Sequence, residues 1–282
     1  MFALSVENKY GDKLRLTGND SYNVVSVTGL TPAAANINMD ALAITDGSVF
    51  NSSQVGGRNI VITVAYKGRP EGARLELYKY FKTKQPIRVY YATSSRDVYI
   101  DGYVETFDGD LFEQGQKAQI SIICPNPFFR SVATNHIDFL ATAGLLEFPV
   151  EFPEEGIEFS GSSPYSEKNI YNSGEVESGM QISVAINGNV SNPIFYNLTS
   201  NERLGLNYDF ENGDRIEIST LSGAKGVTLI RSGVEINLLN YIMPDTTWIT
   251  LYPGDNIFTY TATAGRTYMD VVFTIQALFE GV

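Results

Sequence analysis

Side chains that could carry acid–base or metal chemistry are concentrated in one part of the sequence. Glutamates crowd the region between 147 and 177, at Glu147, Glu151, Glu154, Glu155, Glu158, Glu167, Glu175 and Glu177. Paired carboxylates could hydrolyse glycosidic bonds or hold Ca²⁺. However, the sequence has no Asp-x-Asp-x-Asp calcium loop. We interpret the stretch as a solvated acidic face, and a β-rich hydrolase that uses these carboxylates is kept as an alternative.

Other groups suited to catalysis are scarce. His136 and Cys124 are the only histidine and the only cysteine, so a Ser/His or Cys/His arrangement depends on a single candidate and no intrachain disulfide can form. Cys124 shares the apolar side of an alternating stretch with Ile120 and Ile122, which predicts a buried structural thiol. Glycine-rich phosphate loops and nucleophile elbows are absent. We therefore expect no enzymatic activity, no cofactor and no protein-bound metal.

Trp248 is the only tryptophan, and it leaves two interpretations open. A tryptophan on a β-sandwich could stack on a sugar ring, which would make the chain a carbohydrate-binding protein that adheres to a host surface. More often such a residue is a core or inter-domain aromatic.

Composition and charge narrow the class of protein. The 282 residues include 17 Tyr and 16 Phe, and the charged fraction of 18% is below the usual ~25%; this aromatic, weakly charged composition indicates a globular chain. No secretory leader is visible, and no apolar run approaches the ~20 residues that span a bilayer, so we expect synthesis in a cytoplasm and no membrane association. With a formal net charge of −12, the chain is not expected to bind nucleic acid.

The two halves of the chain differ in charge. Residues 1–133 contain 14 Lys/Arg and 13 Asp/Glu, whereas residues 134–282 contain 6 and 19. This asymmetry predicts an N-terminal domain at 1–133, a linker or edge strand at 134–160 and a C-terminal domain at 161–282.

The first half predicts short strands and one helix. Alternating apolar residues favour strands over 22–30, 59–66 and 97–105. Residues 70–82 predict a helix that begins at a proline and packs on a sheet through Leu77, Tyr78 and Phe81.

Residues 31–58 lack sustained periodicity and predict a long irregular arm. Such an arm is either a self-packed surface loop or a segment that orders against a partner. Val49 and Phe50 would be its two apolar anchors.

The second half predicts strands throughout. They fall at about 168–173, 180–187, 193–199, 204–210, 214–221, 226–231, 234–239, 247–252, 256–262 and 267–278. Turn-forming residues separate these strands, and many short strands at this spacing are typical of a β-sandwich. Residues 145–153 alternate but contain two prolines, which indicates an edge strand or an extended linker.

Several phrases resemble a known family. In the first half they cover 46–51, 58–62, 77–81, 84–88 and 96–104, and in the second half 170–176, 192–194 and 251–256. The residues of these segments and their order along the chain resemble the distal tail protein (Dit) family of long-tailed bacteriophages, and the resemblance covers nearly the whole chain.

The resemblance implies a structural role at the tip of a phage tail. Members form a homohexameric ring, in which a β-sandwich-like N-terminal domain with one helix and a belt arm contacts the tail tube protein. A galectin-like C-terminal β-sandwich lies outside the ring, where receptor-binding or baseplate proteins dock, and the ring seats the tail-associated hub protein. We therefore expect a mainly β protein of two sandwich domains in the virion. Val49, Phe50, Arg58 and Trp248 are its candidate interaction residues.

Overall fold

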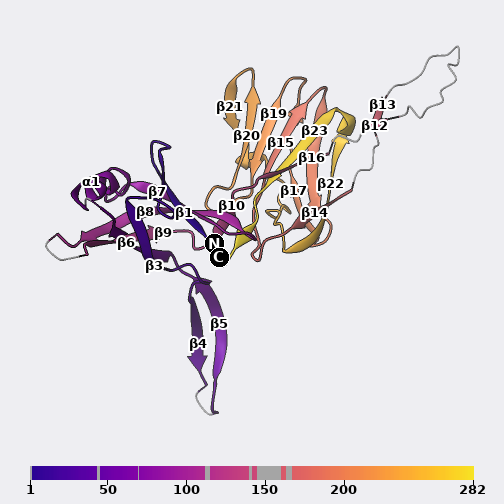
Figure 1. Cartoon of the computed structure of the whole chain (residues 1–282). Coiled ribbons are helices and arrows are strands. Elements are labelled where there is room, and N and C mark those ends of the chain that lie inside the picture. Colours follow the sequence, from indigo (N-terminus) through magenta and orange to yellow (C-terminus); the bar gives the residue numbers. More distant parts are fainter. Residues whose placement is uncertain are drawn as a thin grey trace. The chain divides into compact units, whose positions relative to one another are not determined.

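The computed structural model describes residues 2–42, 45–68, 70–111, 115–139, 142–144, 160–162 and 167–282 (Figure 1). The described residues are mainly β-strands with one α-helix, which confirms the predicted fold class. The chain divides into two compact units. Unit 1 comprises Met1–Ala133 and Leu278–Val282, and unit 2 comprises Thr134–Ala277. Residues 278–282, which we expected in the second domain, therefore return to the first.

Unit 1 is built on one nine-stranded sheet. Seven strands follow the order β2-β1-β7-β8-β9-β6-β3, and β10 and β24 pair beside them. Their bounds are β1 Ala3–Asn8, β2 Lys13–Arg15, β3 Tyr22–Thr28, β6 Arg58–Tyr66, β7 Pro86–Ala92, β8 Asp97–Gly109, β9 Lys117–Cys124, β10 Phe129–Ser131 and β24 Leu278–Phe279. Leu14 and Tyr22 come from opposite edges of the sheet, yet both belong to one apolar core. The sheet therefore curls around this core.

The helix α1, Pro70–Tyr80, packs against that core. Its buried residues are Ala73 and Leu77, and Phe81 continues the same face just after the helix. Tyr78, which we expected in the buried stripe, is exposed and meets the ring of Phe107 edge-on at 4.9 Å. The helix ends two residues earlier than predicted, ahead of a turn in which Lys84 has a φ of 65°.

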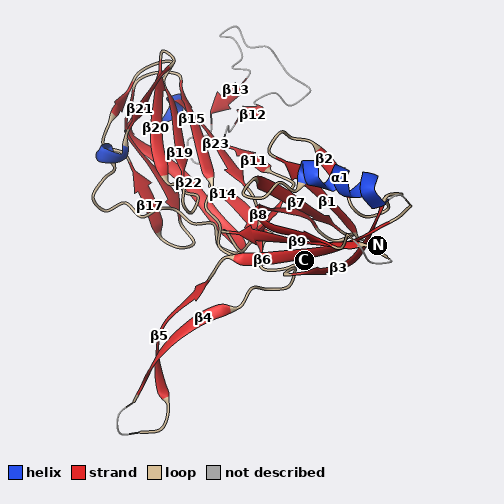
Figure 2. Ribbon diagram, turned by 90° about the vertical axis from the view of Figure 1, so that its left-hand side faces the viewer, coloured by secondary structure: helices blue, strands red, loops and turns tan. Residues whose placement is uncertain are grey.

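Residues 35–41 and 48–55 form a two-stranded ribbon instead of the predicted irregular arm. β4, Ala35–Ala41, pairs antiparallel with β5, Ser48–Val55, and these two strands make a sheet of their own. Both views show the ribbon running away from the sheet of unit 1 (Figures 1 and 2).

Unit 2 is a sandwich of two antiparallel sheets. One has the order β11-β23-β15-β19-β20-β21, and the other has β14-β22-β16-β17 with β18 paired to β16. The bounds are β11 Asn135–Asp138, β14 Lys168–Asn172, β15 Gln181–Ile186, β16 Val190–Asn197, β17 Glu202–Gly205, β18 Asp209–Phe210, β19 Arg215–Ser219, β20 Gly226–Arg231, β21 Val234–Asn237, β22 Gly254–Ala264 and β23 Met269–Ile275. Phe273 of the first sheet and Phe195 and Phe258 of the second share one core. A further short pair joins β12, Thr142–Gly144, to β13, Ser160–Ser162.

Residues 247–252, predicted as a strand, make only an isolated bridge between Leu251 and Ser178. Asparagine side chains take over part of the hydrogen bonding. The Asn197 amide donates to the Thr250 carbonyl at 2.9 Å, and the Asn256 amide donates to the Tyr252 carbonyl at 2.7 Å. The segment therefore satisfies its backbone without joining a ladder. The edge strand predicted at 145–153 lies outside the described residues.

Among the described residues, no helix is long and apolar enough to cross a bilayer.

An ion pair with a buried carboxylate gives unit 2 a pH-dependent contribution to stability. The Arg231 guanidinium donates to both carboxylate oxygens of Asp214, at 2.8 and 2.6 Å, and lowers the pKa of that carboxyl. A lowered pKa in the folded state stabilises the fold above the unfolded pKa of about 3.9, and this contribution is lost as the pH falls through the folded value.

Asp214→Asn should therefore reduce the unfolding free energy of unit 2 by about 1.5–3 kcal/mol at neutral pH. The difference from the parent chain should shrink at about pH 3, as urea denaturation at both values can measure. The matched control is Glu211→Gln, because Glu211 meets the same Arg231 at 3.4 Å but is 71% exposed. An equal effect of the two substitutions would contradict the buried-carboxylate account.

Candidate interaction surfaces

The ribbon presents one apolar face. Its register pairs Met39 with Phe50 and Ala35 with Val55. Paired residues share a face and side chains alternate along a strand, so Ile37 lies on that same face, where its partner is Ser53. Met39 is 60% exposed and Phe50 61% exposed. This set of five residues is the apolar face of the ribbon, and the described residues place no core against it.

The opposite face of the ribbon is polar. The Asn38 amide donates to the Ser52 hydroxyl at 3.0 Å, and the Asn51 amide donates to the Asp40 carboxylate at 2.7 Å. Val49 pairs with Asp40 and therefore lies on this side. Val49 and Phe50, which we expected to act together as anchors, thus point to opposite faces. Met39 and Ile37 were missed, although the alternation over 35–41 was visible in the sequence.

Arg58 is almost fully buried within unit 1. Only 4% of it is exposed, and its guanidinium lies over the ring of Phe129 at 4.6 Å. Its described hydrogen bonds go to backbone carbonyl oxygens of unit 1, and burial lowers its pKa. Arg58 therefore has an internal role in unit 1, and its predicted contact with a partner stays a prediction.

Trp248 packs against the core of unit 2. It is half-buried, and Lys225 places its ammonium 5.7 Å from the centre of the ring. A sugar-stacking tryptophan needs a free ring face, so this position does not favour the carbohydrate-binding alternative.

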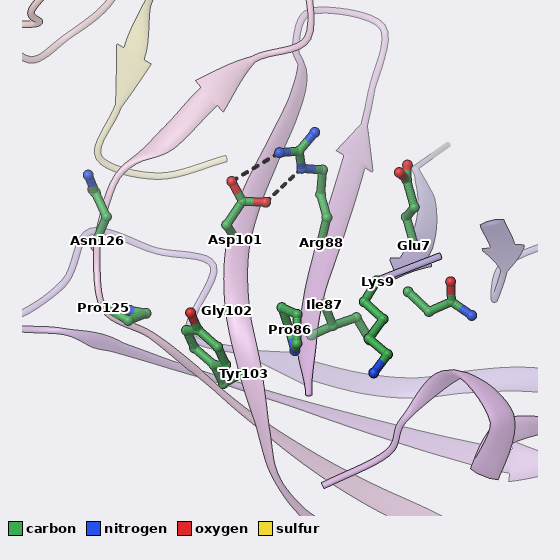
Figure 3. Close-up of a pocket in the computed structure, with 11 residues that line it drawn as sticks. Glu7, Lys9, Pro86, Ile87, Arg88, Asp101, Gly102, Tyr103, Pro125 and Asn126 are labelled. Carbon is green, nitrogen blue, oxygen red and sulfur yellow. Dashed lines mark hydrogen bonds and ion pairs between the residues drawn. The ribbon is translucent and has the colours of Figure 1, made fainter. Parts of the chain in front are cut away.

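A hollow of about 420 Å³ lies on the outer face of the unit 1 sheet (Figure 3). Arg88 and Asp101 face each other there from β7 and β8, with hydrogen bonds of 2.6 and 3.1 Å. The carboxylate raises the pKa of Arg88, so the guanidinium is charged at neutral pH. Pro86, Ile87 and Tyr103 supply apolar walls. The two charges neutralise each other, so this pair adds no net charge to the hollow.

Acid–base and metal chemistry find little support in the described part of the chain. Glu147, Glu151, Glu154, Glu155 and Glu158 lie outside it, so it does not test the hydrolase alternative there. His136 is exposed on β11, and its Nδ1 lies 3.0 Å from the hydroxyl of Thr274. The described residues hold no group of three or more His, Cys, Asp or Glu side chains arranged to bind a metal ion.

Cys124 is fully buried, as the sequence predicted. Burial raises the pKa of its thiol to about 12, so the reactive thiolate is scarce near neutral pH. We expect the folded chain to resist an aromatic disulfide reagent at about pH 8, and the same reagent to modify one thiol per chain in guanidinium chloride. Rapid reaction of the folded chain would contradict this placement.

Family comparisons match both units to phage tail proteins. Residues 173–275 match a model described as the C-terminal domain of the siphovirus-type tail component, and residues 13–124 match the phage tail protein RIFT-related domain. The chain belongs to the siphovirus-type distal tail protein family, which confirms the resemblance seen in the sequence.

Solved structures share the fold over the full length. The Dit protein of phage SPP1, described as a paradigm of the hub adsorption apparatus in phages that infect Gram-positive bacteria, is 15% identical with a TM-score of 0.66, covering 98% of this chain and 99% of that one. A chain of the phage P2 baseplate in its activated conformation with Ca is 11% identical with a TM-score of 0.55, covering 100% of both. The same baseplate with Sr gives 10% and 0.54, with 98% and 99% covered. No curated protein matches the chain.

Proposed function

We propose that this tail component is a structural, non-enzymatic virion protein of the tail tip that assembles into a homohexameric ring. The observation that carries the proposal is the apolar face of the ribbon, where Met39 and Phe50 are more than half exposed on an arm of unit 1. Exposed apolar surface of this kind marks a protein–protein contact. A second copy of the chain is the partner, and each arm packs on its neighbour.

The charge distribution supports an assignment of roles to the two domains. Residues 1–133 carry almost no net charge, so copies of this part can approach one another with little repulsion. Residues 134–282 carry the excess of acidic side chains, and we place this galectin-like domain on the outside of the ring. There it would meet receptor-binding or baseplate proteins, while the ring joins the tail tube protein to the tail-associated hub protein.

Electron microscopy of the purified protein tests the proposal. We expect particles with sixfold symmetry and the acidic domain at the periphery. Single isolated chains at micromolar concentration, or a ring whose lumen is lined by residues 167–277, would contradict it.

A further inference from the structure

Residues 278–282, here called the return segment, complete the sheet of unit 1 after the chain has passed through unit 2. Phe279 of β24 pairs with Phe129 of β10. Arg96 holds the segment from the side, because its guanidinium lies over the ring of Phe279 at 4.7 Å and donates to the Gly281 carbonyl. The return segment is therefore a fixed part of unit 1.

The same segment touches the root of the arm, residues 29–32. The backbone N–H of Val282 donates to the Leu30 carbonyl at 3.1 Å. Gly281 approaches so closely that a Cβ at this position would lie 2.9 Å from the Pro32 Cδ and 3.2 Å from the Leu30 oxygen. A side chain at Gly281 would thus displace the loop that leads into the arm.

Arg58, where the chain leaves the arm, joins these segments. One terminal nitrogen of its guanidinium donates to the carbonyls of Gly29 and Thr31, at 2.7 and 2.8 Å. The other donates to the Glu280 carbonyl at 2.5 Å. The guanidinium is a planar, rigid fork, so its acceptors are held in a defined geometry. The beginning of the arm, its end and the return segment are therefore fixed to one side chain.

The ribbon beyond this root has little other support. Every residue of β4 is exposed, and so is every residue of β5 except Val55. A two-stranded ribbon without a packed face does not set its own direction. The angle at which the arm leaves unit 1 is therefore determined at its root.

We propose that the return segment is a clasp that fixes the direction of the arm. The return segment follows unit 2 in the sequence. The direction of the arm therefore depends on residues that the chain supplies only after unit 2. The link to ring assembly rests on the proposed function, since an arm that points in many directions cannot engage a neighbouring copy.

Spin labels can measure the direction of the arm. Cysteines introduced as Asp46→Cys near the tip of the arm and Lys79→Cys on α1 lie at exposed positions, and the buried Cys124 leaves them as the reactive thiols. Pulsed electron–electron double resonance, with labelled chain diluted into unlabelled chain, reports the distribution of distances between the labels at positions 46 and 79. Native mass spectrometry of the same samples reports the fraction of hexamer.

Three variants of the full chain are compared with the parent. Deletion of 278–282 removes the clasp, and Gly281→Val keeps it but prevents its close approach to the arm. Gly226→Val is the matched control, because no atom lies within 4 Å of a Cβ at that position. If the deletion impairs folding, the milder Gly281→Val still decides the question.

We expect broader distance distributions and loss of the hexamer peak for both clasp variants, with the control like the parent. Distributions as narrow as the parent's in both clasp variants would overturn the clasp, whether or not rings form. The proposed function fails separately, if charges placed on the apolar face of the ribbon leave the hexamer intact while the clasp variants still broaden the distances.

Discussion

A chain that carries Met39→Asp and Phe50→Asp should run as a monomer under conditions in which the parent chain forms a hexameric ring. The two side chains are paired across β4 and β5 on the apolar face of the ribbon. A carboxylate buried without a partner costs about 4 kcal/mol, which corresponds to roughly a thousandfold weaker association at each contact. Native mass spectrometry or light scattering after size exclusion can measure the change.

Val49→Asp is the matched control for this experiment. Val49 adjoins Phe50 on β5 and is 50% exposed, but it lies on the polar face beside Asp40. We expect this variant to retain the hexamer. Rings from the double variant, or their loss in the Val49 control alone, would show that the apolar face of the ribbon is not the contact.

The arm shows what the sequence reasoning could and could not reach. Its length and its small polar residues left two alternatives open, a self-packed surface loop and a segment that orders against a partner; the strands are exposed, and the contact with a partner stays a prediction. Its strands were missed because Asn, Ser and Ala weaken the strand signal, although Ile37 and Met39 alternate with polar residues. Val49 and Phe50 are consecutive residues, so they point to opposite faces once the segment is a strand. The extra residue at Asn51, where β5 shifts its register, also breaks the alternation between Phe50 and Ser53.

Regular strands with one buried face were predicted well. Most strands of unit 2 lie within a few residues of their predicted positions, because apolar alternation marks them directly. The strand predicted at 247–252 was wrong. Its sequence pattern is that of a strand, but two of its carbonyls accept hydrogen bonds from the side chains of Asn197 and Asn256. Such long-range bonds leave no local trace in a sequence.

Arg58 and the return segment could not be predicted for the same reason. The contact between Arg58 and Glu280 spans 222 positions in the sequence. An arginine next to a flexible arm is ordinarily interpreted as a surface group, and only the fold shows that it lies over Phe129 inside unit 1.

Phe273→Ala should lower the unfolding free energy of unit 2 by about 3–5 kcal/mol, because it leaves a cavity between the two sheets. Phe273 of β23 lies 5.3 Å from the ring of Phe258 in the facing sheet and 4.8 Å from that of Phe139. It is fully buried, so little of the cavity can be filled by solvent. Differential scanning calorimetry should show a lower melting temperature for the transition of unit 2.

The same variant separates stability from assembly. If the ring is formed by the arms of unit 1, Phe273→Ala should keep the hexamer at temperatures below the melting of unit 2. Tyr171→Ala is the control within unit 2, because Tyr171 is 63% exposed and its loss should leave both the melting temperature and the ring unchanged. If the Phe273→Ala ring dissociates while unit 2 is still folded, part of the contact between subunits must involve the surface of unit 2. The division of labour between the two units would then have to be revised.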